Sequence, residues 1–320
     1  MSRPFFSVVI ATRNRPKTLA ACLEALSHLD YPRDRFEVIV VDDESELPPE
    51  EVVASFTDRL DVLMLRQPQA GPGAARNTGV ARAKGDVLVF TDDDCAPASD
   101  WLERLALYFA EAKGLAVGGR TINGLPDDPY ATASQLIVDV VYAHYNAHSD
   151  RARFVASNNL AVSKDHFRAL GGFDSASFPS AAEDRDLCDR WLFHGYRITY
   201  APEVLVRHSR PMTFAAFCRQ HFNYGRGAFR FQRARVRRGS GHVVKELGFY
   251  RSLPSLVWRS FSQTHVRRPL LPAVLLVVWQ VANAVGFFWE WAAQTGKRFV
   301  TGIESKPRIA NPPVETDRAV

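Results

Sequence analysis

Residues 86–94 have the sequence Asp86-Val87-Leu88-Val89-Phe90-Thr91-Asp92-Asp93-Asp94, an apolar run that ends in three consecutive aspartates. The run is short, rich in β-branched residues and preceded by Gly85, a pattern that predicts a buried strand. Carboxylates are rarely buried without partners, so three of them at the end of a core strand need a counter-charge. A hard divalent cation with oxygen ligands, shared with substrate phosphates, would supply it. The alternative is a solvated acidic loop that caps the next helix.

The composition is typical of a globular protein, with 46% hydrophobic and 23% charged residues in a chain of 320. This length allows one large core, alone or with a smaller appendage. The four cysteines lie far apart without a CxxC pair, which predicts neither a disulfide framework nor a zinc site and favours a reducing compartment. No signal peptide is expected before the first strand, which begins at Phe5.

Strand and helix patterns alternate along the first third of the chain. We expect strands at 5–11, 36–41, 62–65 and 86–91, and helices at about 17–29, 47–56, 74–83 and 101–112. This alternation predicts a mostly parallel sheet with flanking helices, in which ligands bind at the carboxyl ends of the strands. Polar clusters follow three of these strands, at Thr12–Asn14, Asp42–Asp43 and Asp92–Asp94, so we expect them to converge on one edge.

The pattern is less regular beyond Leu115. It predicts a helix at 136–145, a strand at 154–162, a turn at 170–174 and a helix at 182–194 that begins with Glu183 and Asp184. Two short strands at 197–200 and 204–208 and a basic, aromatic helix at 214–232, broken at Gly225 and Gly227, are expected to follow. Residues 270–293 are mostly apolar, and a tail begins at about residue 307.

Six motifs in this order resemble family 2 glycosyltransferases, which have the GT-A fold. They are Ser7–Asn14, Val41–Ser45, Gly71–Gly79, Asp92–Asp94, Gly171–Asp174 and Glu183–Asp184. The resemblance covers about residues 5–230. It implies a Rossmann-like α/β catalytic domain at residues 1–212. We expect a basic, aromatic helical extension at 213–265, an apolar membrane-associating or core-covering helix at 266–300, and a tail at 301–320.

The resemblance implies an inverting enzyme that transfers a sugar from a nucleotide-diphospho-sugar to an acceptor hydroxyl, with Mg²⁺ or Mn²⁺ as cofactor. Asp92 and Asp94 match the metal-binding carboxylates of the family, and Asp94 is the more direct ligand. Asp93 would face the ribose or the sugar, and Asp43 would contact the nucleobase. His208 follows the last core strand and is either a metal ligand or a structural histidine.

The acidic pair Glu183–Asp184 matches the position of the family's general base, and the resemblance assigns that role to Asp184, with Glu183 next in line. The alternative is that both residues only favour the first turn of a helix through its dipole. Arg76 could meet the diphosphate or form a surface salt bridge, and Asn159 could bind sugar hydroxyls or complete a strand edge. The predicted donor-binding residues are Thr12, Asn14, Asp43, Arg76, Asp92, Asp93 and Asn159.

Two features of the last third suggest a membrane surface. Arginines crowd residues 219–238, and residues 270–293 are long enough to span a bilayer but contain Gln280, Asn283 and Glu290. We favour a membrane-attached or in-plane segment at the cytoplasmic face over a clean single span, and a helix that covers its own catalytic domain is the third possibility. The acceptor would then be a glycan or a lipid-linked molecule of cell-envelope polysaccharide or glycolipid synthesis.

Two other functions are compatible with this fold. A nucleotidyltransferase that makes an activated sugar normally has a glycine-rich loop after the first strand, and Thr12–Arg15 contains no glycine. A non-catalytic binding protein on the same scaffold would not need the full set of carboxylates. Nucleic acid is not an expected partner, because the basic stretch contains no recognisable reader module.

Overall fold

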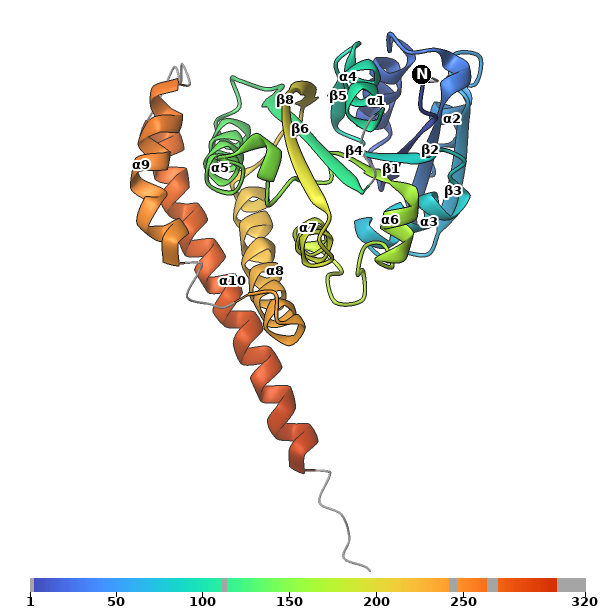
Figure 1. The fold of residues 1–320 in the computed structure, drawn as a ribbon. Helices are drawn as coiled ribbons and strands as arrows, with labels where there is room; N and C mark the ends of the chain where they lie inside the picture. The colour runs from blue at the N-terminus through green and yellow to red at the C-terminus, as the bar shows by residue number, and fades with distance from the viewer. Residues whose placement is uncertain (1–2, 111–113, 242–246, 264–269, 304–320) are drawn as a thin grey trace, which may run out of the picture.

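The computed structural model describes residues 3–110, 114–241, 247–263 and 270–303, and Figure 1 traces their fold. One sheet of eight strands lies at the centre, in the order β3-β2-β1-β4-β7-β6-β8-β5. The strands are β1 (Phe6–Thr12), β2 (Phe36–Asp43), β3 (Val62–Gln67), β4 (Val87–Asp92), β5 (Cys95–Pro97), β6 (Leu115–Asn123), β7 (Asn159–Ser163) and β8 (Arg197–His208). The helices are α1 (Pro16–Ser27), α2 (Glu50–Ala54), α3 (Pro72–Arg82), α4 (Trp101–Phe109), α5 (Pro129–Tyr145), α6 (Lys164–Ala169), α7 (Glu183–Phe193), α8 (Phe214–Arg238), α9 (Leu247–Gln263) and α10 (Leu270–Ile303).

The register of the first strands brings the predicted polar clusters to one edge. β1 pairs in parallel with both β2 and β4, so that Thr12 lies opposite Asp42 and Ala11 lies opposite Asp92. The second half of the sheet is mixed, because β7 runs antiparallel to β4 and β6, and β5 runs antiparallel to β8. The α/β architecture is as predicted, with antiparallel strands inserted into a sheet that begins as parallel.

The central strands are buried on both faces, which explains their unbroken apolar sequences. Along β1, Phe6, Val8 and Ile10 pack with α1 and α4 on one face, while Val9 packs with α3 on the other. All four side chains are fully buried. Such a strand can occupy only the centre of a three-layer arrangement, and this fixes the position of the polar residues that follow it.

The predicted break in the basic helix is wrong, because α8 runs without interruption from Phe214 to Arg238. A Cβ atom added at Gly225 would lie 2.0 Å from the carbonyl oxygen of Asn283, and one at Gly286 would lie 2.0 Å from that of Phe222. These two glycines therefore let the backbones of α8 and α10 approach closely. The two short strands expected at 197–208 are one strand, β8, and the strand expected from residue 154 begins only at Asn159.

α5, α8, α9 and α10 form a helical layer beside the sheet domain, and α8 lies between α7 and α10 (Figure 1). The layer has its own apolar core, which contains Ala133, Leu136, Ile137, Val140, Phe217, Phe249, Leu275, Leu276 and Trp279. Glu290 of α10 is buried at 4% exposure and pairs with Arg226 and Arg230 of α8, both at 2.8 Å. Glu290, one of the three polar residues that interrupt the apolar pattern of α10, thus faces α8.

The opposite face of α10 is apolar and exposed. It carries a stripe at helical spacing, formed by Leu270, Val274, Val277, Val281, Val285 and Phe288, each at least half exposed. By length and composition alone, one segment of α10, Leu270–Thr295, is long and apolar enough to cross a bilayer, and 28% of its most apolar stretch is buried within the protein.

The Glu290 cluster should stabilise the helical layer in a pH-dependent way. Burial alone would raise the pKa of Glu290, but hydrogen bonds from Arg230, Gln294 and Arg226 lower it to about 2. The lowered pKa stabilises the fold above the unfolded pKa of about 4.3, and this contribution is lost as pH falls toward 2. We expect Glu290→Gln to lower the free energy of unfolding at pH 7 by about 1.5–3 kcal/mol in urea titrations.

The matched control is Asp100→Asn, which removes an exposed pair with Arg104 at 2.8 Å. Exposed pairs contribute little, so this change should alter the free energy of unfolding far less than Glu290→Gln does. A Glu290→Gln effect no larger than that of the control, or one that persists unchanged at pH 3, would contradict the prediction.

Candidate active site

The aspartate triplet lies where β4 ends and the chain turns into β5. Asp93 is fully buried, and it accepts a hydrogen bond from Thr12 Oγ1 at 2.7 Å. The Nη1 atom of Arg15 lies 3.0 Å from Asp93 Oδ1 and 2.5 Å from Asp94 Oδ2. The Nε2 atom of His208 lies 3.1 Å from Asp94 Oδ1. Residues at the ends of β1, β4 and β8 therefore meet at one point.

The pairing of β5 with β8 explains the position of His208, because it places Cys95 opposite His208. The ligand atoms of Asp94, Cys95 and His208 all lie within 4.8 Å of one another. Burial raises the pKa of the Cys95 thiol, so this side chain remains a protonated thiol. Carboxylate oxygens and an imidazole nitrogen are left as donors, and this donor set fits a hard divalent cation such as Mg²⁺ or Mn²⁺.

Asp93 and Asp94 lie next to each other, but their surroundings shift their pKa values in opposite directions. Burial raises the pKa of Asp93 to about 7, against the opposing charge of Arg15. Burial would also raise the pKa of Asp94, but the hydrogen bond and charge of His208, with the charge of Arg15, lower it overall. Burial acts to lower the pKa of His208, and the hydrogen bond to Asp94 raises it overall. Arg15 thus supplies positive charge where the predicted cation would bring it, and His208 forms a hydrogen bond with the carboxylate of Asp94.

Arg76 connects the triplet to α7. Its side chain is 4% exposed, and Nη2 lies 2.7 Å from Asp92 Oδ1 while Nη1 lies 3.0 Å from Glu183 Oε1. The sequence left a diphosphate contact or a surface salt bridge open for Arg76, and the observed bridge is buried. Because Glu183 is already neutralised by this arginine, it is poorly suited to act as a free base.

Asp184 follows in the first turn of α7, after Ala182, whose φ of 73° is in the left-handed region. Its carboxylate is half-buried and accepts N–H hydrogen bonds from Arg185 at 2.7 Å and from Ser157 at 3.4 Å. Burial and the negative charge of Glu183 raise the pKa of Asp184 to about 7. A carboxylate with this pKa, held apart from the aspartate triplet, has the properties of a general base near neutral pH.

Two other residues predicted to bind the nucleotide sugar lie at the same edge of the sheet and hold its loops. Asp43 accepts hydrogen bonds from the N–H groups of Ala70 and Gly71, both at 2.9 Å. Gly71 has a φ of 90°, and a Cβ atom there would lie 2.3 Å from the carbonyl oxygen of Pro179, so only glycine fits. Asn14 accepts a hydrogen bond from the N–H group of Glu46 at 2.8 Å.

Asn159 does not lie with the others. It is 1% exposed, accepts a hydrogen bond from the indole N–H of Trp101 at 2.9 Å, and donates to the carbonyl oxygen of Val204 at 2.9 Å. These contacts join β7, α4 and β8 in the core. Because its amide is committed to protein partners, we leave Asn159 out of the candidate donor site.

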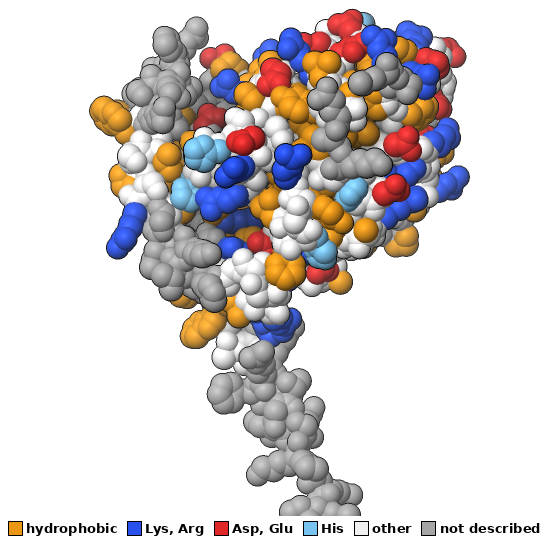
Figure 2. All heavy atoms as spheres, in the orientation of Figure 1, with side chains coloured by type: hydrophobic (Ala, Val, Ile, Leu, Met, Phe, Trp, Pro, Cys, Tyr) orange, Lys and Arg blue, Asp and Glu red, His pale blue; other side chains and the backbone are white. Residues whose placement is uncertain are grey.

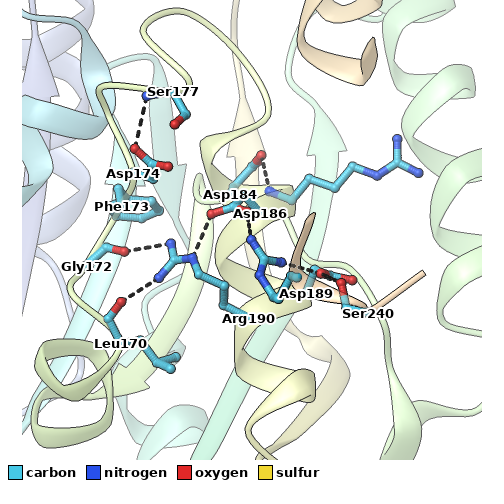
Figure 3. Close-up of polar contacts among 12 residues, drawn as sticks. Leu170, Gly172, Phe173, Asp174, Ser177, Asp184, Asp186, Asp189, Arg190 and Ser240 are labelled. Carbon is cyan, nitrogen blue, oxygen red and sulfur yellow. Dashed lines mark hydrogen bonds and ion pairs between the residues drawn. The ribbon is translucent and has the colours of Figure 1, made fainter. Parts of the chain in front are cut away.

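Figure 3 illustrates how α7 is anchored. Arg190 donates to Asp186 at 2.7 Å and to the carbonyl oxygens of Leu170 and Gly172 at 2.8 and 2.7 Å. At the end of α8, Arg238 pairs with Asp186 at 2.5 Å and also with Asp189.

Sequence reasoning missed Arg15, Arg190 and Arg238. The only signal in the sequence that could have indicated these arginines is the clustering of the acidic residues with which they pair. For the arginines of 219–238, sequence reasoning left an external anionic partner and a solvated helix face open. Arg226, Arg230, Arg235 and Arg238 instead pair with acidic residues within the protein.

Comparison with known proteins identifies a matching family and several relatives, some of them much longer than this chain. Residues 7–170 match the family model described as glycosyl transferase family 2. Glycosyltransferase AglE of Haloferax volcanii is 28% identical over 286 residues, which are 86% of this chain and 92% of that protein. A pre-mycofactocin glycosyltransferase of Mycobacterium tuberculosis is 32% identical over 210 residues, or 63% of this chain, and the chain covers only 42% of that longer protein.

Among solved structures, the mannosyltransferase PcManGT from Pyrobaculum calidifontis, in complex with GDP-Man and Mn²⁺, superposes with a TM-score of 0.64. The match covers 91% of this chain and 88% of that one at 20% identity. At this identity the likeness is one of fold.

Removal of Arg76 should be costly because it leaves two carboxylates without their shared cation. We expect Arg76→Met to lower the free energy of unfolding by about 3 kcal/mol, the scale on which breaking a buried ion pair destabilises a protein. The control is Arg59→Met, which breaks an exposed pair with Glu24 at 2.9 Å and should cost far less, because exposed ion pairs contribute little to stability. Chemical denaturation measures the free energy of unfolding of both variants. Equal losses would show that the buried Arg76 bridge contributes no more to stability than an exposed ion pair.

Proposed function

The chain belongs to glycosyltransferase family 2 and has the GT-A fold, and from its site we propose an inverting enzyme that uses a nucleotide-diphospho-sugar. Family and enzyme class are as predicted from the sequence, which removes the nucleotidyltransferase and the non-catalytic binding protein as alternatives. The observation that carries the mechanism is Asp184, a half-buried carboxylate separate from the aspartate triplet, whose neighbour Glu183 is already paired with Arg76.

The donor would bind at the edge formed by β1, β2 and β4. Thr12 positions Asp93 there, and Asn14 and Asp43 hold the surrounding loops. Asp94 and His208, with Asp92, would hold Mg²⁺ or Mn²⁺. When bound, such a cation neutralises the charge that develops on the leaving diphosphate. The Mn²⁺ in the complex of PcManGT with GDP-Man supports this assignment.

Asp184 would act on the acceptor. Its carboxylate takes the proton of the acceptor hydroxyl while the hydroxyl oxygen bonds to the anomeric carbon and the bond from that carbon to the diphosphate oxygen breaks. One displacement inverts the configuration at the anomeric carbon. Arg76 keeps Glu183 paired, so Asp184 is the carboxylate available for the proton.

We further propose that the enzyme works at the cytoplasmic face of a membrane, in the synthesis of a cell-envelope polysaccharide or glycolipid. The support is the exposed apolar stripe of α10, whose other face is bonded to α8, so the helix would lie in the membrane plane rather than cross it. Figure 2 displays apolar side chains at the edge occupied by α9 and α10. The predicted domain division, at residues 212, 265 and 300, stays a proposal, and the tail from residue 304 lies outside the described residues.

The metal assignment predicts opposite effects of two substitutions. Asp94→Asn should remove Mn²⁺ binding and abolish turnover, because it replaces the more direct ligand. Arg15→Ala should strengthen Mn²⁺ binding without nucleotide, because the arginine pairs with the same carboxylates. Mn²⁺ binding is measured by calorimetry, or by electron paramagnetic resonance of the unbound ion. The control is Arg13→Ala, which alters an exposed arginine that donates a hydrogen bond to the carbonyl oxygen of Glu44. Donor binding that is indifferent to EDTA in all four proteins would refute the metal site.

The base assignment predicts the pH profile of transfer. Asp184 must be ionised to accept a proton, and its pKa is raised to about 7. The logarithm of kcat/KM should therefore rise by one per pH unit below about pH 7 and level off above it. Asp184→Asn should lower the transfer rate by two or more orders of magnitude, the usual scale for a general base, and leave donor binding nearly intact. Transfer at the wild-type rate in this variant would make Asp184 structural.

The membrane assignment predicts that attachment depends on the apolar stripe. We expect Val277→Asp combined with Val281→Asp to release the protein from vesicles of anionic phospholipid in a flotation assay. High salt should release little wild-type protein, because the α8 arginines named above are paired internally.

The matched control is Leu107→Asp on α4, which alters a leucine that is 72% exposed far from the stripe. Wild-type protein found wholly in the soluble fraction would favour a helix that only covers its own domain. Resistance to alkaline carbonate would favour a span.

A further inference from the structure

β7 begins at the edge of the sheet where the candidate active site lies. It runs antiparallel to β4, and Asn159 at its start pairs with Thr91, the residue before Asp92. The start of β7 therefore lies beside the end of β4, among the strand ends at which open α/β sheets bind their ligands. Asn158, which directly precedes β7, is half-buried at this edge.

The backbone around Asn158 joins the two halves of the candidate site. Its carbonyl oxygen accepts a hydrogen bond from Thr91 Oγ1 at 3.1 Å. The N–H group of the preceding residue, Ser157, donates to the carboxylate of Asp184 at 3.4 Å. The Arg76 bridge makes a second connection between the same two elements, β4 and α7. Asn158 thus lies between the aspartate triplet and the candidate base.

The side chain of Asn158 is oriented by one neighbour. Its Oδ1 atom accepts a hydrogen bond from the hydroxyl of Thr121 at 3.3 Å. Thr121 is 5% exposed and lies in β6, opposite Val206 of β8. With the oxygen held in this way, the Nδ2 group presents two donors, and neither has a hydrogen-bond partner within the described residues. Unlike the unpartnered polar atoms of the core, Nδ2 keeps contact with solvent, so a ligand can reach it.

The proposed displacement places the transferred sugar beside this amide. The acceptor oxygen lies at Asp184, and the leaving diphosphate oxygen lies at the aspartate triplet. In a single displacement the anomeric carbon stands between these two oxygens, so the sugar ring lies between the start of α7 and the end of β4. Asn158 is bonded to both elements and borders that space. A sugar hydroxyl offers the acceptor oxygen that its amide lacks.

We propose that Asn158 determines which sugar is transferred, with Nδ2 donating a hydrogen bond to one hydroxyl oxygen of the donor sugar, and that Thr121 positions the amide for this contact. The inference rests on the proposed function and adds a specificity-determining residue to it. A site that hydrogen-bonds a hydroxyl discriminates against the deoxy sugar that lacks it, because the donor group is then left without a partner. The contact involves the sugar alone, so the nucleoside diphosphate binds without it.

The test uses the full-length enzyme and the UDP- or GDP-hexose that it hydrolyses fastest. Hydrolysis without an acceptor is slow, so its KM reports donor binding, and the matching UDP or GDP is measured as an inhibitor. Asn158→Ala should raise the donor KM about fivefold, the scale of one neutral hydrogen bond, and leave the inhibition constant unchanged. The variant keeps the backbone contacts with Thr91 and Asp184, so the base stays in place. Thr121→Val should raise the donor KM by a smaller factor, because the amide remains but loses its orienting hydroxyl.

Monodeoxy analogues of the same donor locate the contact. The wild-type enzyme should bind one analogue about fivefold more weakly than the parent, and Asn158→Ala should bind the two equally, because the hydroxyl and the amide act as a pair. The matched control is Asn146→Ala. Asn146 holds the same segment through the N–H group of Arg153 at 3.2 Å and the carbonyl oxygen of Phe154 at 2.7 Å. This change should lower stability without altering the ratio of affinities for parent and deoxy donors.

Three results would overturn the inference. The first is an equal loss of affinity for UDP or GDP in Asn158→Ala, and the second is a wild-type enzyme that binds every deoxy donor as tightly as the parent. The third is a raised KM for an octyl hexopyranoside acceptor with an unchanged donor KM. A wild-type enzyme that neither hydrolyses nor transfers any nucleotide hexose would instead refute the proposed function.

Discussion

The site depends on the buried guanidinium of Arg76, which bridges Asp92 at the end of β4 and Glu183 at the start of α7. An arginine can hold two carboxylates in a fixed geometry because its donors are planar and its charge persists at any physiological pH. Without it, the sheet edge and α7 would each present an unpaired negative charge to the other. The bridge therefore sets the distance between the predicted metal site and the candidate base, and it decides which carboxylate of the acidic pair is free.

Two arginines at this edge differ in how strongly they are held. Arg76 is 4% exposed and enclosed between two elements, whereas the side chain of Arg15 is 42% exposed and reaches Asp93 and Asp94 from the solvent side. A half-exposed arginine can be displaced by another cation that takes over its buried partners, because water solvates the charge of the released guanidinium. The buried cation is thus suited to a permanent structural role, and the exposed one to exchange with a ligand. The three aspartates need a positive charge beside them at all times. Arg15 supplies it in the free enzyme, and the proposed cation would supply it in the bound enzyme.

The sequence predicted the first half of the fold well because each signal there was local. β1, β2 and β4 have unbroken apolar sequences, and parallel pairing then forces the residues after them to one edge. The second half depends on distant partners. β5 and β6 are strands because β8 pairs with both, and Gly225 interrupts no helix because α10 needs the space that a side chain would fill. In the sequence, Asn159 looks like a polar residue at the edge of a strand. Only the fold shows that its amide accepts a hydrogen bond from Trp101 and donates one to Val204.

The arrangement of α8 connects the two ends of the proposed reaction. One side of the helix is joined to α10 through Arg226, Arg230 and the close contacts at Gly225, and another meets the start of α7 at Gly227. The packing of Gly225 and Gly227 leaves little room for α8 to slide against either neighbour, since both contacts are to backbone carbonyl groups. An α10 fixed at a membrane surface would therefore fix the height of Asp184 above that surface. A glycan terminus attached to the membrane would have to reach the same height, so the length of its attachment becomes part of the selectivity of the enzyme.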